Sequence, residues 1–397
     1  MPDMDSRKLN SLEEEVSKVL TISDIKAIAT KKLAPMYRDY YNDGSMDMIS
    51  MQDNEAAFDR YKLRPRILVD VSTIDTSTTI FGKKVAFPLG FAPAAMHRLA
   101  HPDGEVATSR AAAKANIAMG LSSYATASIE EVGAEAKLNP YFMQLSILDD
   151  REKTLRMIRR VEAAGFSAIF ITVDAPLLGR RLNEFRNRFT LPEQYGFPNL
   201  YDNDEDGAVQ VNNGFSRHRP KDVDPEQGMK GLVHVGRAHG LRWDDVVPWL
   251  RRNTKLEVWL KGVYTPEDVQ LAIRYGVDGV VISNHGGRQL DGVPATLDAL
   301  RECAPVAAGR IQIAIDGGIR RGSDIFKALA LGAQHCFVGR VPIWSLAYNG
   351  QDGVDRAIEI LMDEFRLVMG LTGCAKVQDI SPNHLSVLNF NGMLCKL

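Results

Sequence analysis

Cysteine is scarce in this 397-residue chain, and the four residues present argue against two kinds of stabilised fold. Cys303, Cys336, Cys374 and Cys395 include no Cys-x-x-Cys pair, so they indicate neither a disulfide scaffold nor a structural zinc site. No apolar run reaches the roughly 18 residues that span a bilayer. The N-terminus is polar, unlike a secretory signal. We therefore expect an intracellular, reducing environment and no membrane partner.

The chain also lacks a strong charge and a convincing metal motif. Its formal net charge is −2, which predicts no nucleic-acid or acidic-membrane partner. The stretch 202–207 imitates the start of a calcium loop, but the twelfth position is Asn213 instead of Glu. His97 and His101 are four residues apart without a His-Glu-x-x-His pattern, beside a Pro-Asp-Gly turn signal. We expect no metal, with a solvated loop and a turn at these two places.

Eight short apolar runs, separated by segments with helical patterns, determine the expected fold. These runs are residues 87–92, 118–122, 141–145, 168–173, 258–261, 279–282, 311–315 and 336–339. The alternation predicts an α/β fold with a closed (β/α)8, or TIM, barrel. An open doubly wound sheet is the competing architecture, but the count of eight and the polar residues at several strand ends favour the barrel.

Terminal signals predict individual helices and the organisation of the chain. Residues 151–164 follow Asp150, a capping acid, and end at Gly165, while 266–275 follow Thr265 and stop at Gly276. We expect residues 1–75 to form a helical extension packed on the barrel, opened by a capping box at 11–14, and 76–397 to form the barrel itself. Between the fourth and fifth strands, residues 180–255 form a long insertion. Its middle, about 190–240, is expected to be mobile, and Phe215 within it is either a lid residue or an ordinary loop position.

The most informative stretch follows the sixth expected strand. There His285 and Arg288 lie three residues apart on a glycine-rich turn, Ser-Asn-His-Gly-Gly-Arg. An imidazole takes up a proton near neutral pH, and a guanidinium binds a carboxylate through two hydrogen bonds. A base beside an anion clamp is what the oxidation of a small hydroxy acid requires. The competing interpretation is a histidine that only satisfies local hydrogen bonds.

Other strand ends carry polar residues as well, and barrels gather function at the C-terminal ends of their strands. The third strand ends in Gln144, the fourth in Thr172 and Asp174, the fifth in Lys261, and the sixth in Ser283 and His285. After strand seven comes Asp316-Gly317-Gly318-Ile319-Arg320, and after strand eight Gly339-Arg340. Glycine turns and a helix beginning near Gly322 can close backbone N–H groups on an anion, so we predict a phosphate here.

These features combine into a flavin site. Lys261 is expected near the N1/O2 edge of an isoalloxazine ring, where its charge would stabilise the reduced ring. The turn Pro93-Ala94-Ala95 after the first strand is expected to offer backbone groups to N5. The residues alone leave open whether the phosphate ligand is FMN or another molecule.

From about Asp24 to Asn383 the chain resembles the FMN-dependent L-2-hydroxy acid oxidase family, which includes glycolate oxidase, lactate oxidase and flavocytochrome b2. The resemblance rests on the segments Asp39-Tyr40-Tyr41, Ala92-Pro93-Ala94-Ala95-Met96, Thr172-Val173-Asp174, Gly179-Arg180-Arg181, Leu260-Lys261-Gly262-Val263, the His285–Arg288 turn and residues 316–322. It implies FMN as cofactor, conversion of a small 2-hydroxy acid to a 2-oxo acid, and a homotetramer.

The resemblance also implies a role for each matching residue. His285 would be the base and Asp174 its partner, while Arg181, Arg288 and Tyr40 would hold the substrate carboxylate and Tyr124 would face the substrate. The residues expected to contact FMN are Pro93, Ala94, Ala95, Ser122, Gln144, Thr172, Lys261, Ser283, Asp316, Gly317, Gly318, Arg320, Gly339 and Arg340.

One position departs from the family pattern. The family normally has an active-site tyrosine two residues after the strand-three glutamine, and here that residue is Ser146. Either the pocket is enlarged for a bulkier 2-hydroxy acid, or the enzyme has lost a hydrogen bond and is slow on small ones.

Two further expectations concern the setting of the reaction. With no haem-binding domain ahead of the barrel and no membrane span, molecular oxygen is the expected electron acceptor, giving hydrogen peroxide. Cys395-Lys396-Leu397 approximates the Ser-Lys-Leu signal, which predicts the peroxisome, with the cytoplasm as alternative.

A different flavin or phosphate barrel enzyme explains the glycine turns but not His285, Arg288 and Arg181 together. A non-catalytic FMN-binding protein has only Ser146 in its favour.

Overall fold

The computed structural model describes residues 19–200, 238, 240–388 and 391–396. The predicted capping box at 11–14, the acidic stretch 202–207, Phe215 and the C-terminal Leu397 lie outside the described residues. Within the described ranges, no helix is both long and apolar enough to cross a membrane.

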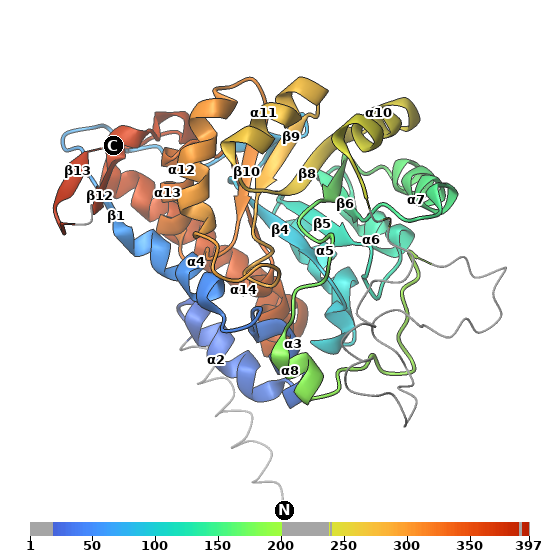
Figure 1. Ribbon diagram of the computed structural model, residues 1–397. Helices are drawn as coiled ribbons and strands as arrows, with labels where there is room; N and C mark the ends of the chain where they lie inside the picture. Colours follow the sequence, from blue (N-terminus) through green and yellow to red (C-terminus); the bar gives the residue numbers. More distant parts are fainter. Residues whose placement is uncertain (1–18, 201–237, 239, 389–390, 397) are drawn as a thin grey trace, which may run out of the picture.

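Eight parallel strands close into a barrel (Figure 1). Around the barrel their order is β10-β11-β4-β5-β6-β7-β8-β9, so sequence neighbours are also neighbours in space and β11 pairs with β4 to close the ring. The strands are β4 (Leu89–Ala94), β5 (Ala118–Ser122), β6 (Tyr141–Leu145), β7 (Ala168–Thr172), β8 (Glu257–Val263), β9 (Gly279–Ile282), β10 (Gln312–Asp316) and β11 (His335–Val338). The predicted (β/α)8 barrel is confirmed, and every predicted strand has its counterpart.

The first barrel strand differs most from its predicted bounds. It begins at Leu89 and runs to Ala94, whereas the sequence predicts 87–92 followed by a turn at 93–95. The pairing of β4 with β5 shifts register between Phe91 and Ala94. This irregularity keeps Pro93 and Ala94 within the strand, since a proline is tolerated in a sheet where the ladder is interrupted.

Large aromatic and small side chains fill the barrel interior together. Phe142, Phe170, Trp259 and Phe337 are all buried there, and Ala118 and its counterparts on other strands leave room for them. A hairpin of β2 (Thr78–Ile80) and β3 (Lys83–Val85) precedes the first barrel strand. At its turn Phe81 contacts Phe142, Phe170 and Trp259 edge-on, with ring centroids 5.4–5.8 Å apart. The interior of the barrel is therefore a packed core, which leaves the C-terminal ends of the strands as the place where this fold binds ligands.

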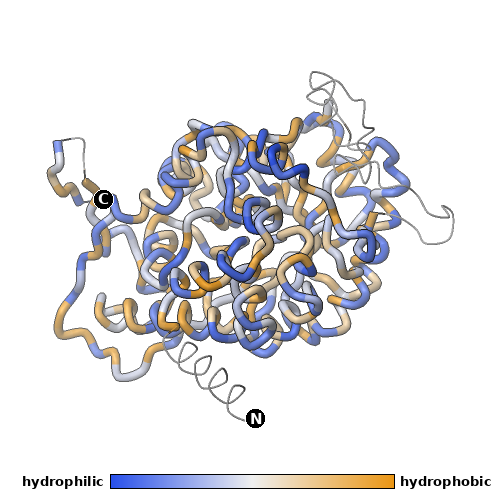
Figure 2. The backbone as a smooth tube through the Cα atoms, turned by 90° about the horizontal axis from the view of Figure 1, so that it is seen from below, coloured by the Kyte–Doolittle hydropathy of each residue, from blue (hydrophilic) through white to orange (hydrophobic). Residues whose placement is uncertain are grey.

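Helices surround the barrel, and along the backbone they carry both hydrophobic and hydrophilic segments (Figure 2), as expected for helices with one face on a core. The helices after the strands are α5 (Gly104–Lys114), α6 (Ile129–Ala136), α7 (Arg151–Ala163), α10 (Trp243–Asn253), α11 (Pro266–Tyr275), α12 (Thr296–Ala307), α13 (Gly322–Ala330) and α14 (Arg340–Thr372). The predicted caps are confirmed: the Asp150 side chain accepts from the first turn of α7, and Thr265 does so for α11.

The N-terminal helices α2 (Ile22–Lys32), α3 (Pro35–Asn42) and α4 (Ile49–Arg60) lie against the barrel helices (Figure 1). α2 packs along α14 and α4 contacts α12. The C-terminal strands form a small antiparallel sheet with β1 (Tyr61–Leu63), which pairs with β12 (Leu385–Leu388), and β12 pairs with β13 (Leu394–Lys396). Remaining short elements are α8 (Leu182–Arg186), η1 (His97–Leu99), η2 (Val377–Asp379) and η3 (Pro382–His384).

Candidate active site

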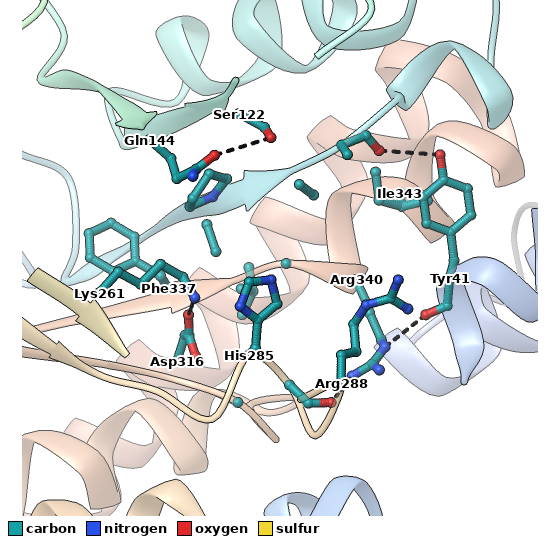
Figure 3. Close-up of a pocket in the computed structure, with 18 of the residues that line it drawn as sticks. Tyr41, Ser122, Gln144, Lys261, His285, Arg288, Asp316, Phe337, Arg340 and Ile343 are labelled. Carbon is teal, nitrogen blue, oxygen red and sulfur yellow. Dashed lines mark hydrogen bonds and ion pairs between the residues drawn. The ribbon is translucent and has the colours of Figure 1, made fainter. Parts of the chain in front are cut away.

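A pocket lies where the C-terminal ends of the barrel strands meet the turns that follow them (Figure 3). The empty space in it, counted out into the open solvent, is about 1330 Å³. Most of the residues predicted for the site line it. They are Tyr40, Pro93, Ala94, Ala95, Ser122, Tyr124, Gln144, Thr172, Arg181, Lys261, His285, Arg288, Asp316, Gly317, Gly318, Arg320, Gly339 and Arg340. Asp174, Ser283 and Ser146 stand behind this lining.

His285 projects into the pocket from the turn after β9, in the left-handed conformation with φ of 58°. Its Nδ1 lies 2.9 Å from Asp174 Oδ1 and 3.2 Å from Oδ2. Enclosure within the pocket lowers the pKa of His285, and this outweighs the opposite effect of Asp174. Burial raises the pKa of Asp174, but the facing His285 and Lys261 bring it below its ordinary range. The pair therefore consists of a neutral imidazole held by a carboxylate at neutral pH.

Lys261, at the end of β8, is buried beside two partners. Its Nζ donates to Ser283 Oγ at 2.9 Å and pairs with Asp316 Oδ2 at 3.2 Å. Burial lowers the pKa of Lys261, but Asp316 and Asp174 together raise it above its ordinary value. Ser283 Oγ also accepts the backbone N–H of His285 at 3.1 Å. One hydroxyl thus connects the ammonium to the turn that carries the histidine.

Two arginines, one from the segment after β7 and one from the turn after β9, meet at a single carboxylate. Glu184 accepts from Arg181 Nε at 2.5 Å and Nη2 at 3.1 Å, and from Arg288 Nη2 at 3.2 Å. Burial and the charge of Arg181 lower the pKa of Arg288, and Glu184 opposes them. Arg288 also donates to the backbone carbonyl of Tyr40, and its guanidinium carbon lies 4.7 Å from the centre of the Tyr40 ring.

Gln144 organises the opposite side of the pocket, across from His285 and Arg288 (Figure 3). Its Nε2 donates to Thr172 Oγ1 at 3.0 Å, and its Oε1 lies 3.3 Å from Ser122 Oγ. Ser146 is buried behind it, with its Oγ 3.5 Å from Gln144 Nε2. Ser146 is not among the residues that line the pocket, since its short side chain ends at the amide of Gln144. Its predicted contact with the substrate stays a prediction.

The far end of the pocket is rich in guanidinium groups. Arg340 begins α14, and burial together with Arg288 and Arg320 lowers its pKa to about 9. Among the described residues, two buried polar atoms at the pocket have no hydrogen-bond partner: Asp316 Oδ1 and Arg320 Nε. One is an acceptor and the other a donor, which is what a ligand with hydroxyl groups and a phosphate would satisfy.

Sequence reasoning missed two residues of the site. Glu184 follows Arg181 at the i,i+3 spacing typical of a helical ion pair, and that signal was available in the sequence. Gln289 donates from Nε2 to the carbonyls of Asp174 and Leu177, and its Oε1 accepts from Gly179 N. Its contacts lie more than a hundred residues away along the chain, so no local pattern reveals them.

Comparison with known proteins decides the family. A model of the FMN-dependent dehydrogenase family matches residues 29–387. The chain belongs to this family. The resemblance seen in the sequence is confirmed, and with it the FMN cofactor. The match covers the whole barrel together with the N-terminal helices α3 and α4, so these helices are part of the family unit.

Relatives extend this membership to oxidases. The chain is 48% identical to the oxidase FUB9 of Fusarium oxysporum f. sp. lycopersici, over 98% of this chain and 96% of that protein. It is 43% identical to glycolate oxidase of Spinacia oleracea, over 93% and 96%. A solved structure of mandelate oxidase with benzoyl-formic acid superposes with a TM-score of 0.79 at 35% identity, covering 93% of this chain and 98% of that one. The chain is thus an FMN-dependent oxidoreductase of the 2-hydroxy acid oxidase group.

Proposed function

We propose that this enzyme oxidises an L-2-hydroxy acid to the corresponding 2-oxo acid and passes the electrons to molecular oxygen, forming hydrogen peroxide. The observation that carries the proposal is that His285, held by Asp174 at 2.9 Å, lines a pocket that Arg181 and Arg288 also line. Relatives named glycolate oxidase and 2-hydroxyacid oxidase support the substrate class and the acceptor.

His285 serves as the base in this proposal. A carboxylate can only accept, so the Asp174 contact keeps the proton of the imidazole on Nδ1 and leaves Nε2 as an acceptor. Nε2 takes a proton from the substrate, and Asp174 then stabilises the imidazolium that forms. Because the pKa of His285 lies below its ordinary value, the imidazole is already neutral when the substrate enters.

Arg288 and Arg181 hold the substrate carboxylate, with the Tyr40 ring beside them. Both guanidinium groups line the pocket, and Arg288 is only three residues from the base on the same turn. In a 2-hydroxy acid the carboxylate carbon is bonded directly to Cα. A carboxylate bound by the two arginines would therefore place Cα next to the imidazole of His285. Tyr124 also lines the pocket and packs edge-on against Phe197, with centroids 5.4 Å apart, which gives the substrate side chain an aromatic wall.

FMN fits the remaining residues. Asp316 Oδ1 would accept from a ribityl hydroxyl, and Arg320, with the backbone at Gly317, Gly318, Gly339 and Arg340, would hold the phosphate at the start of α14. Lys261, Gln144, Thr172, Ser122 and the backbone of Pro93–Ala95 would contact the ring. When bound, FMN supplies the two-electron acceptor for the Cα–OH group.

An anaerobic experiment tests the proposal. The purified yellow protein is mixed with a panel of L-2-hydroxy acids, from small to aromatic, and bleaching of the flavin is followed. Bleaching by one class of acid, with colour and peroxide returning on exposure to air, is the expected result. A bound flavin that no hydroxy acid reduces would contradict the proposed substrate class. Bleaching without re-oxidation by air would contradict oxygen as acceptor.

A bulkier substrate is the second candidate, and Ser146 favours it. The family's tyrosine at this position would add a phenol ring, whereas Ser146 contributes only a short hydroxyl 3.5 Å from the Gln144 amide and leaves that volume free. The aromatic ligand in the mandelate oxidase structure is consistent with a family pocket that accepts a ring. The same panel distinguishes the two candidates through the size of the acid that bleaches the flavin fastest.

We further propose that the C-terminal residues direct the protein to peroxisomes. Cys395 and Lys396 belong to β13, and both are exposed at the edge of the small sheet. Deleting residues 395–397 from a fluorescent fusion is expected to move it from peroxisomes to the cytosol. A fusion that stays in place after the deletion, or that never enters peroxisomes, would contradict the proposal.

A further inference from the structure

Glu184 occupies an unusual place for an acidic residue, between the two arginines assigned above to the substrate. Its side chain is 12% exposed, and the two guanidinium groups are buried to a similar degree, at 4% for Arg181 and 16% for Arg288. An acid is costly to keep so close to an anion-binding site unless it does something there, because it repels the very group the site must attract.

The contacts of Glu184 show that it fixes the orientation of both arginines. Both oxygens of Glu184 accept from Arg181, through Nε and Nη2, which fixes the plane of that guanidinium. Oε1 is shared with Arg288 Nη2, so one oxygen joins the segment after β7 to the turn after β9. Two long side chains from segments about a hundred residues apart are thereby held in one orientation.

The charge of Glu184 also stabilises the pair of arginines. Two buried guanidinium groups repel each other, and a carboxylate between them offsets that repulsion. With Glu184 in place the cluster of two arginines and one glutamate carries a net single positive charge, which matches a single substrate carboxylate. Neither arginine needs the substrate to remain in place, so the clamp is formed before binding and little side-chain entropy is lost on binding.

We propose that Glu184 is a positioning residue that holds Arg181 and Arg288 together as one preformed site for the carboxylate of the substrate. The inference rests on the proposed function of those two arginines. Glu184 acts through them, and its removal therefore weakens carboxylate binding much more than it slows the oxidation step.

The test uses the purified holoenzyme and Glu184→Gln, which keeps the shape of the side chain and removes its charge. Binding of pyruvate, as a non-reducing 2-oxo acid, is measured from the perturbation of the flavin spectrum. KM and the limiting rate of anaerobic flavin reduction are measured with the best hydroxy acid of the panel. The matched control is Glu130→Gln, which removes a carboxylate paired with Arg160 on the surface, away from the pocket.

We expect Glu184→Gln to raise both the Kd for pyruvate and the KM by about 10- to 100-fold, the range typical of a lost hydrogen bond to a charged group. The limiting rate should change little, and Glu130→Gln should behave as wild type. Glu184→Asp retains the charge but shortens the reach to Arg288, so its Kd for pyruvate and its KM should lie between those of the wild type and those of Glu184→Gln. A Kd and KM like those of the control, or a loss confined to the limiting rate, would overturn the inference.

Two outcomes are kept separate by this design. If no hydroxy acid reduces the wild-type flavin, the proposed function fails, whereas the pyruvate titration still decides the role of Glu184. If Glu184→Gln yields no folded holoenzyme, Glu184→Asp is judged by the same Kd and KM criteria, and unchanged values there would overturn the inference.

Discussion

Asn54 and Asn284 form a reciprocal pair, in which each side-chain amide donates to the oxygen of the other at 2.9 Å. Asn54 lies on α4, and Asn284 immediately precedes the proposed base His285. Asn284 Oδ1 also accepts from Gly287 N, and Asn54 Oδ1 accepts from Thr296 N. The α4 helix is therefore hydrogen-bonded to the turn that carries both His285 and Arg288, and it supports the site without lining it.

The first prediction concerns the same helix and the phosphate turn. A Cβ added at Gly318 would lie 1.9 Å from the Asn54 carbonyl oxygen, so Gly318→Ala must push α4 and the turn apart. We expect the variant to bind FMN at least about tenfold more weakly, since displacement of a closely packed backbone costs more than the roughly 1 kcal/mol of the glycine conformation itself. FMN content per chain and the Kd of the apoprotein for FMN are the measurements.

Gly309 offers a matched control for that prediction. It has φ of +73°, close to the +80° of Gly318, but nothing lies within 4 Å of a Cβ built there. Gly309→Ala should therefore lose stability from the strained backbone and keep its FMN. Equal FMN loss in both variants would show that backbone strain, and not contact with Asn54, is responsible.

The second prediction concerns pH. Because His285, as the proposed base, acts when neutral and its pKa is lowered, kcat/KM should fall only when the pH drops below about 6.5. Asp174 raises the pKa of His285, so Asp174→Asn should move this acidic limb to still lower pH. The same change removes the partner of the imidazolium, and we expect a fall in the rate of flavin reduction of about 100-fold or more. An acidic limb that moves upward would contradict the assignment.

The third prediction concerns the size of the substrate pocket. Ser146→Tyr adds a phenol ring that reaches farther than the serine hydroxyl, which ends 3.5 Å from the Gln144 amide. We expect kcat/KM to rise for glycolate and lactate relative to aromatic acids, because the ring both fills volume and offers a hydroxyl. Steady-state kinetics on the acid panel measure the ratio. If activity on lactate and glycolate did not change, both explanations for Ser146 would fail.

The fourth prediction concerns stability in acid. His335 is 1% exposed at the start of β11, and burial lowers its pKa to about 3 from 6.5. As the pH falls from 6.5 towards 3, His335 therefore takes up a proton in the unfolded chain but stays neutral in the folded chain. The free energy of unfolding then decreases by up to about 1.4 kcal/mol per pH unit. His335→Leu should flatten this dependence in denaturant titrations at several pH values. A stability difference that is the same at every pH would indicate a packing effect alone.

Local patterns determined much of this protein in advance. The eight apolar runs specify the barrel because each buried strand needs only its own few residues to be apolar. Asp150 and Thr265 begin their helices because a cap bonds backbone groups two or three residues away. His285 and Arg288 enter one pocket because they share one turn, and all parallel strands deliver their C-terminal ends to the same side of a barrel.

Tertiary structure decided what depends on residues far apart in the sequence. Asn54 and Asn284 are separated by 230 positions, and the contact of Glu184 with Arg288 spans 104. The irregularity that keeps Pro93 in β4 arises from pairing with β5, and Ser146 is set behind Gln144 by the packing of the barrel end. Hydrogen bonds and packing of this kind form only after the chain has closed on itself. The residues proposed for catalysis were therefore readable from local sequence, whereas the residues that hold them in place became visible only in the fold.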